Sequence, residues 1–207
     1  MAYTRPLVQL LTKIQNRVRG LKQRWGTSGA KRDLWNKEFA NGRWATIEDT
    51  SGDLIYRFIE KYSAGGAGSI LDLGCGSGNT GCELPSSAYS DYLGVDISDV
   101  ALEQAEDRSR KLQRDRKNSY ARGDIESFIP PRKYDVILFR ESIYYVPKTH
   151  IKSTLDRYSQ FLTPGGVMMI RVHDQKQGEG ISKLLELGRQ TVEKHLPPSG
   201  PFIFVVR

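Results

Sequence analysis

The sequence predicts an α/β fold: a doubly wound, mostly parallel seven-stranded sheet with a C-terminal antiparallel hairpin and an N-terminal helical extension. From residue 69 onward, strand-like and helical segments alternate, which is typical of a parallel sheet with helices on both faces. The apolar run 70–73 leads directly into the glycine-rich loop 74–78, so a buried strand is expected to turn sharply into a helix. Two short strand-like segments, 190–196 and 202–206, end the chain and predict the hairpin.

The N-terminal segment has the periodicity of an amphipathic helix. Its apolar residues recur at alternating steps of four and three, which places them on one helical face: Leu7, Leu11, Ile14, Val18, Leu21 and Trp25. Residues 26–29 interrupt this pattern, and further helices are expected over 33–39 and 53–62. We therefore predict two parts, a helical extension or lid over residues 1–45 and the α/β domain over residues 46–207.

The body is expected to follow the order strand, helix, strand. The predicted strands are 69–73, 92–96, 119–123, 134–139 and 166–172, and the predicted helices are a short one after Gly78, then 98–117, 147–162 and 181–187. Only 13 residues separate Gly78 from Tyr92, so the first of these helices has room for barely two turns. The sequence Thr163–Gly166 is expected to end the helix before it.

The positive charge of the chain is concentrated in the extension. Eight basic residues precede the first acidic residue, Asp33, whereas the remainder carries 23 basic and 24 acidic residues. One interpretation is a helix that packs on the domain or on a second copy and has a solvated polar face. The other is that residues 5–32 contact an anionic membrane surface or an acidic substrate.

Composition limits the remaining possibilities. A chain of 207 residues suits one α/β domain with a modest extension. It has no apolar run long enough for a membrane span and no signal-like N-terminus, so a cytoplasmic location is expected. The two cysteines, Cys75 and Cys82, are expected to be buried thiols. Three histidines without ligand spacing predict no metal site.

The glycine-rich loop is suited to bind a nucleotide-like cofactor. Glycines allow the backbone N–H groups to approach a ligand closely, and the following helix N-terminus is electropositive. Asp72 precedes the loop and can accept hydrogen bonds from a ligand ammonium or from loop amides. The next strand ends at Asp96, about where an acidic residue meets ribose hydroxyls. If the glycines served only a tight turn, this second acid would be a coincidence.

The segment Asp72-Leu73-Gly74-Cys75-Gly76-Ser77-Gly78, followed by Val95-Asp96, resembles the first two motifs of class I S-adenosylmethionine-dependent methyltransferases. Dinucleotide-binding dehydrogenases are the competing family, but their glycines are spaced G-x-G-x-x-G. The resemblance implies S-adenosylmethionine as cofactor and S-adenosylhomocysteine as product. The cofactor-binding residues that it implies are Asp72, Gly74, Cys75, Gly76, Gly78, Asp96, Ile97, Asp124, Ile125 and Arg140. Asp124 has the alternative role of a turn residue at a strand end.

The acceptor is expected beyond the fourth strand, because open α/β sheets bind ligands at the carboxyl ends of their strands. Glu141, Tyr144 and Tyr145 are the candidates there for orienting or deprotonating the acceptor, while Tyr145 and Val146 have the alternative role of capping the next helix. His173 follows the fifth strand; histidine titrates near neutral pH, which suits a general base, although a lone histidine at a strand end is often structural. The predicted catalytic residues are thus Glu141, Tyr144 and His173.

The motifs that the sequence lacks reduce the number of possible acceptor classes. The Asn/Asp/Ser-Pro-Pro-Tyr/Phe motif of base-modifying enzymes, the Pro-Cys nucleophile of cytosine-C5 enzymes and the acidic metal cluster of catechol-type enzymes are all missing. The aromatic segment before Trp44 and the edge at residues 141–145 resemble the nodulation protein S family, which acts on sugars or natural products. We therefore predict methyl transfer to an oxygen or nitrogen of a small molecule, such as a saccharide or natural product, with no nucleic-acid partner. The alternatives are an RNA methyltransferase that uses the basic extension and a non-catalytic cofactor-binding module. The acceptor's identity and the oligomeric state stay open.

Overall fold

The computed structural model describes residues 4–44, 50–186 and 188–207, without the side chains of residues 4–8, 10 and 11. Arg5, Leu7 and Leu11 of the predicted basic and apolar pattern, and the expected boundary between residues 45 and 46, lie outside that description. Among the helices described, none is long and apolar enough to cross a membrane.

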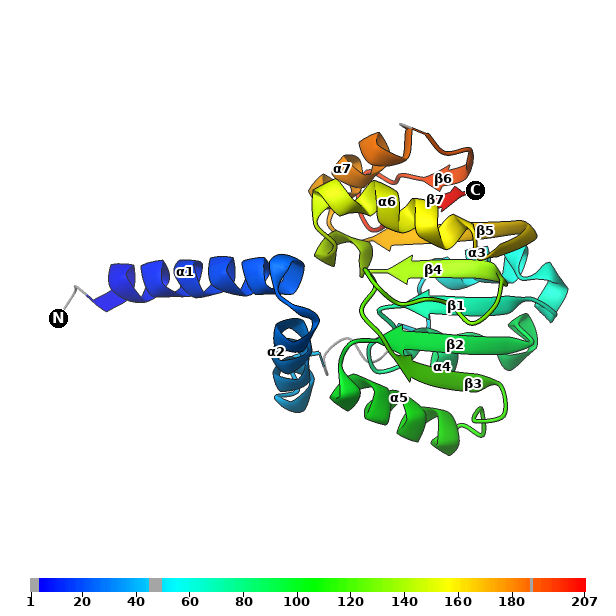
Figure 1. Cartoon of the computed structure of the whole chain (residues 1–207), viewed down its shortest axis with the longest axis horizontal. Helices are drawn as coiled ribbons and strands as arrows, with labels where there is room; N and C mark the ends of the chain where they lie inside the picture. Colours follow the sequence, from blue (N-terminus) through cyan, green and yellow to red (C-terminus); the bar gives the residue numbers. More distant parts are fainter. Residues whose placement is uncertain (1–3, 45–49, 187) are drawn as a thin grey trace.

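The described strands form one seven-stranded sheet in the order β3-β2-β1-β4-β5-β7-β6 (Figure 1). The five parallel strands are β1 (Ser69–Leu73), β2 (Asp91–Asp96), β3 (Asn118–Arg122), β4 (Tyr134–Arg140) and β5 (Leu162–Val172). β6 (Thr191–His195) and β7 (Phe202–Val206) form the antiparallel hairpin, and β7 pairs with β5. The predicted fold class is confirmed.

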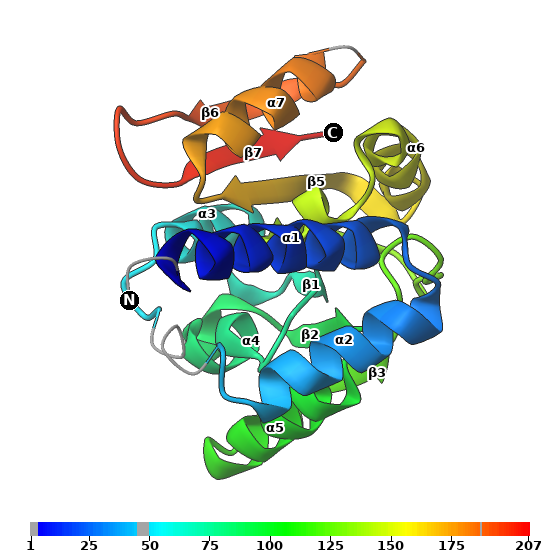
Figure 2. The same ribbon diagram turned by 90° about the vertical axis from the view of Figure 1, so that its left-hand side faces the viewer.

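The sheet is buried on both faces, as its apolar strands require. In β1 the residues alternate between the faces: Ile70 belongs to one hydrophobic cluster, whereas Leu71 and Leu73 belong to the other. The first cluster includes side chains of α3 (Ile55–Tyr62), and the second includes side chains of α6 (Lys148–Ser159) and α7 (Gln175–Glu186). Figure 2 shows α6 on the opposite side of the sheet from α3 and α4 (Asn79–Glu83).

Several helices differ from the predicted ranges for local reasons. α5 (Asp99–Lys111) ends before residue 117, and Gln113 just beyond it has a left-handed backbone with φ 56°. α6 ends at Ser159, and the segment 163–166, the expected stop of this helix, is already part of β5. α7 begins at Gln175 instead of residue 181, because Asp174 accepts the backbone N–H of Gln177 and Gly178 N–H bonds the Asp174 carbonyl. Short 3-10 turns, among them η4 (Ile143–Tyr145), complete the chain.

Two helices form the N-terminal extension. α1 (Thr4–Trp25) and α2 (Ser28–Ala40) meet at a sharp turn, where Thr27 caps α2 by accepting the backbone N–H of Ala30. The parallel strands point toward these helices, and α1 then projects away from the body (Figures 1 and 2). Its apolar stripe is exposed: Ile14, Val18, Leu21 and Trp25 keep 47–59% of their surface. The stripe is therefore not part of the core of the sheet.

Candidate functional site

A cavity of about 470 Å³ lies at the carboxyl ends of β1, β2, β4 and β5, under the base of α1 and α2. Its volume is within the range of small-molecule pockets. Twelve of the thirteen predicted site residues line it: Asp72, Gly74, Cys75, Gly76, Asp96, Ile97, Asp124, Ile125, Arg140, Glu141, Tyr144 and His173. Residues far apart in the sequence thus share one cavity, because parallel strands end at the same edge of the sheet.

Gly78 is the predicted site residue that does not line the cavity. It caps α4 with φ 80°, and a Cβ there would lie 2.8 Å from the Cβ of Ala105. A glycine is required at this position because a side chain would clash with α5. Gly74, in contrast, has φ 81° within the cavity wall, and an added Cβ would lie 2.5 Å from Ser142 Cβ. A side chain at Gly74 would therefore clash with Ser142, and the loop runs along the cavity wall as bare backbone at this position.

Asp72 has an unsatisfied oxygen. The residue is 1% exposed, its Oδ2 accepts the hydroxyl of Tyr92 at 2.8 Å, and its Oδ1 has no partner among the described residues. Burial raises the pKa of this carboxyl to about 6. A buried acceptor without a donor is costly, so this oxygen is suited to a ligand N–H group such as an ammonium.

Asp96 holds the glycine-rich loop in place. Its two oxygens accept the backbone N–H groups of Gly76 and Ser98, each at 2.9 Å. Burial raises its pKa and outweighs these hydrogen bonds, which act in the opposite direction. Burial also raises the pKa of the Cys75 thiol, with Asp96 and Asp72 adding to the effect. Cys75 is therefore a wall of the cavity and not a nucleophile.

At the other end of the cavity, α2 is attached to the loop after β3. Lys31 Nζ lies 3.3 Å from Asp124 Oδ2 and 2.5 Å from Glu126 Oε2, and Ser28 Oγ donates to Asp124 Oδ2 at 3.0 Å. The Asp124 side chain also accepts the backbone N–H of Glu126, as a turn residue does. Asp124 thus lines the cavity, while its carboxylate is bonded to the extension.

A partly buried network of four charged residues follows β4, and two of the four were not predicted from the sequence. Arg140 and Arg171 both pair with Asp53, at 2.8 and 2.9 Å, and Arg171 also pairs with Glu141 at 2.6 Å. Glu141, held at φ 56°, accepts the hydroxyl of Tyr144 at 2.9 Å. Arg140 therefore lines the cavity with its guanidinium already paired. Asp53 and Arg171 belong to no motif; their only signal in the sequence is charge at the ends of apolar segments.

Tyr144 is fixed as a hydrogen-bond donor. Burial raises the pKa of its phenol, and the nearby Tyr145 and Glu141 raise it further. The phenol therefore stays protonated at neutral pH and cannot itself be a base. His173, by comparison, is exposed at the rim of the cavity.

Aromatic side chains form a wall on the extension's side of the cavity. Trp35 lies edge-on to Tyr145 at 4.8 Å between ring centroids, and 5.9 Å from Trp44. Phe39 lies 6.4 Å from both tryptophans, and Tyr144 lies 4.7 Å from Tyr145. This wall gives the site an apolar face on that side.

These residues fit S-adenosylmethionine, which supplies an electrophilic methyl group on a sulfonium. Asp72 offers an unpaired oxygen, the loop offers close backbone, and the aromatic faces and carboxylates suit a cation. Because methyl transfer is an in-line displacement, the work of the chain's own residues is to position the two reactants and to exclude water.

Comparisons with known proteins agree with this geometry. Residues 71–168 match the family model described as a methyltransferase domain. The chain is 27% identical over 139 residues to 27-O-demethylrifamycin SV methyltransferase of Amycolatopsis mediterranei, covering 64% of this chain and 50% of that protein. It is 29% identical over 109 residues to the mRNA cap guanine-N(7) methyltransferase of Schizosaccharomyces pombe, covering 48% and 30%. The chain thus spans half or less of the length of these relatives.

Solved structures share the fold. The N-methyltransferase NodS of Bradyrhizobium japonicum, solved with S-adenosylhomocysteine, superposes with a TM-score of 0.66 at 19% identity, covering 85% of this chain and 97% of that one. Magnesium protoporphyrin IX methyltransferase of Synechocystis superposes with a TM-score of 0.69 at 14% identity, covering 87% and 96%. The glycine-rich loop, the two buried acids, the sheet order and these similarities lead to one conclusion: the chain has the fold of the class I S-adenosylmethionine-dependent methyltransferases, and its residues 71–168 match a methyltransferase domain.

Proposed function

We propose that the protein transfers the methyl group of S-adenosylmethionine to an oxygen or nitrogen of a small molecule. The observation that carries this proposal is the shape of the site: a cavity of about 470 Å³ bordered by the base of α1, by α2 and by the aromatic wall. It has to hold the donor methyl group and the reacting end of the acceptor together. A polymer would need an open groove at the same place.

The charges at the base of the extension support a small acceptor. The basic residues nearest the cavity are bonded within the chain: Arg19 pairs with Glu38, Arg24 donates to the Tyr144 carbonyl, and Lys31 pairs with Asp124 and Glu126. A nucleic acid would need such residues to neutralise its phosphates. Arg24 and Lys31 attach the extension to the domain instead, and Arg19 joins α1 to α2, which fits the proposed role of residues 1–45 as a lid.

Within this function, Tyr144 and Glu141 are the proposed catalytic pair. Tyr144 donates its hydroxyl hydrogen bond to Glu141, so the phenol oxygen keeps lone pairs that can accept a hydrogen bond from an N–H or O–H of the methyl acceptor. His173 at the rim is the other proposed proton acceptor. From the resemblance to class I methyltransferases, we also assign Ile97 and Ile125, which line the cavity, to the part of the site that binds adenine.

The proposal is tested by methyl transfer from labelled S-adenosylmethionine to a fractionated small-molecule extract and to total RNA. We expect label in small molecules that resist ribonuclease. Y144F should reduce turnover and leave cofactor affinity unchanged. Label confined to RNA, with none in the small-molecule fraction, would contradict the proposal.

An RNA acceptor is the second candidate, because one relative is named for methylating mRNA caps. The exposed part of α1 adds Lys13, Arg17 and Lys22, and the described residues give these side chains no partner. In this case binding to RNA should weaken steeply with salt.

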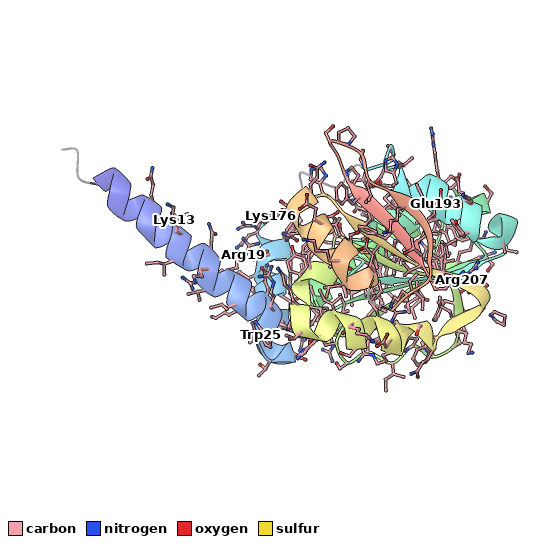
Figure 3. All side chains as sticks on the ribbon, turned by 90° about the horizontal axis from the view of Figure 1, so that it is seen from above. Lys13, Arg19, Trp25, Lys176, Glu193 and Arg207 are labelled. Atoms are coloured by element: carbon pink, nitrogen blue, oxygen red, sulfur yellow. The ribbon has the colours of Figure 1, made fainter. Side chains whose placement is uncertain are left out.

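A third proposal concerns α1, whose exposed surface combines the apolar stripe with basic residues such as Lys13 (Figure 3). Helix α1 carries no acidic residue, and such helices bind anionic lipid surfaces. The vesicle assay described in the Discussion tests this interaction separately from turnover.

A further inference from the structure

Two buried N–H donors on the extension's side of the cavity have no acceptor. Gln23 of α1 is 8% exposed and lines the cavity, and its Nε2 has no hydrogen-bond partner among the described residues. Trp44, which follows α2, also lines the cavity, and its buried Nε1 has no described partner either. Because buried donors are nearly always satisfied, both atoms point to a ligand atom that accepts hydrogen bonds.

The two donors are held in place by their surroundings. On α1, Arg19 pairs with Glu38 of α2, and Arg24 donates to the Tyr144 carbonyl at 3.1 Å. Gln23 lies between these two anchors, at the base of the helix, whereas Lys13 lies on its projecting part (Figure 3). Trp44 is held by its ring contacts with Trp35 and Phe39. The donors are therefore preorganised.

The donors are separate from the features assigned to the cofactor. The unpaired oxygen of Asp72 and the glycine-rich loop belong to β1 and the turn after it, at the edge of the sheet. Gln23 and Trp44 come from a different part of the chain, the N-terminal extension, which also lines the cavity. We assign the unpaired acceptor oxygen to the cofactor and the two unpaired donors to a second ligand.

The chemistry of this side selects a class of acceptor. Both unpaired atoms are neutral N–H donors, which fit a ligand atom with a free lone pair, such as an oxygen. The cations that line the cavity, Lys31, Arg140 and Arg171, all pair with carboxylates, so a free anion is not favoured. The rings of Trp35, Trp44 and Tyr145 present apolar faces that pack against a ring.

We propose that Gln23 Nε2 and Trp44 Nε1 bind an oxygen of the methyl acceptor, and that this acceptor is a neutral, oxygen-bearing ring compound. Gln23 and Trp44 are then specificity-determining residues contributed by the extension. The inference rests on the proposed function. Sugars and phenolic rings share this chemistry, and the test distinguishes them.

Calorimetry with the full chain saturated with S-adenosylhomocysteine tests the proposal with two pairs of probes. The phenolic pair is 4-hydroxyacetophenone and 4-ethylphenol, and the sugar pair is methyl N-acetyl-β-D-glucosaminide and methyl β-D-glucopyranoside. Within each pair only the first probe has a carbonyl oxygen. We expect the wild-type protein to prefer the carbonyl probe of one pair about three- to tenfold, which corresponds to one net hydrogen bond.

Q23L and W44F should each remove this preference while the affinity for S-adenosylhomocysteine stays within about twofold. Q15L is the matched control, because Gln15 is an exposed glutamine of the same helix, and it should keep the preference. No preference in the wild-type protein, including no binding of any probe, would overturn the inference, as would a preference that survives in both variants. Failure to bind S-adenosylhomocysteine would instead contradict the proposed function.

Discussion

Asp72→Asn provides the sharpest test of the site, because it separates the stability of the protein from its affinity for the cofactor. Burial raises the pKa of Asp72 from 3.8 to about 6. The folded protein therefore holds this proton more tightly than the unfolded chain does. For such a group, stability is highest below the unfolded pKa and falls as the pH rises toward the folded pKa.

The size of the effect follows from the two pKa values. A rise of the pKa from 3.8 to about 6 corresponds to roughly 3 kcal/mol, which the wild-type protein loses between about pH 4 and pH 7 because of this carboxyl. The asparagine amide of the variant does not titrate in this range. The free energy of unfolding of the variant minus that of the wild type should therefore increase by about 3 kcal/mol over this range, measured by urea denaturation at several pH values.

The same substitution should weaken cofactor binding. If the unpaired Oδ1 accepts the cofactor's ammonium, the charge-assisted hydrogen bond contributes about 1.5–3 kcal/mol, so Asp72→Asn should weaken binding by about tenfold or more. A difference in stability that does not vary with pH would refute the burial argument. An unchanged affinity for S-adenosylmethionine would refute the ligand argument.

Asp135→Asn is the matched control. Burial acts to raise the pKa of Asp135, but hydrogen bonds from Ser69 and Thr163 outweigh it and lower the pKa. Its contribution to stability is therefore present above the unfolded pKa and lost as the pH falls. The variant should be destabilised at pH 7 but much less at low pH, with unchanged cofactor affinity, because Asp135 is outside the cavity lining.

Three further predictions concern the cofactor and the extension. Calorimetry should detect binding of S-adenosylmethionine and S-adenosylhomocysteine and no comparable affinity for NAD; tight NAD binding alone would refute the assignment. Asp96→Ala should weaken cofactor binding by at least about tenfold in a folded protein, because it removes a buried charged acceptor that also holds Gly76 N–H. Deletion of residues 1–28 should leave a folded domain that binds the cofactor, since the stripe on α1 is exposed, while lowering acceptor turnover or salt-sensitive binding to anionic vesicles. A truncated protein that fails to fold would show that the extension belongs to the core.

Local sequence patterns were enough to predict the sheet and the cofactor side of the site. These patterns are apolar runs with period two or 3.6, glycines that need a left-handed backbone, and acids at strand ends. Asp72 and Asp96 could be identified because each lies beside its own strand end, and parallel strands bring those ends together. Gly78 shows the limit of this reasoning, since the same motif position is required by Ala105, 27 residues away, and not by the cavity.

The charge pairs and buried donors around the site, in contrast, could be seen only in the folded chain. The pairing of Arg140 and Arg171 with Asp53 joins three distant segments, and Lys31 is attached to Asp124 across a similar separation. No local pattern encodes such contacts, because they depend on how the extension packs against the edge of the sheet. For the same reason, Gln23 is one more polar residue of a basic helix in the sequence, and only the packing of that helix makes it a buried donor facing the cavity.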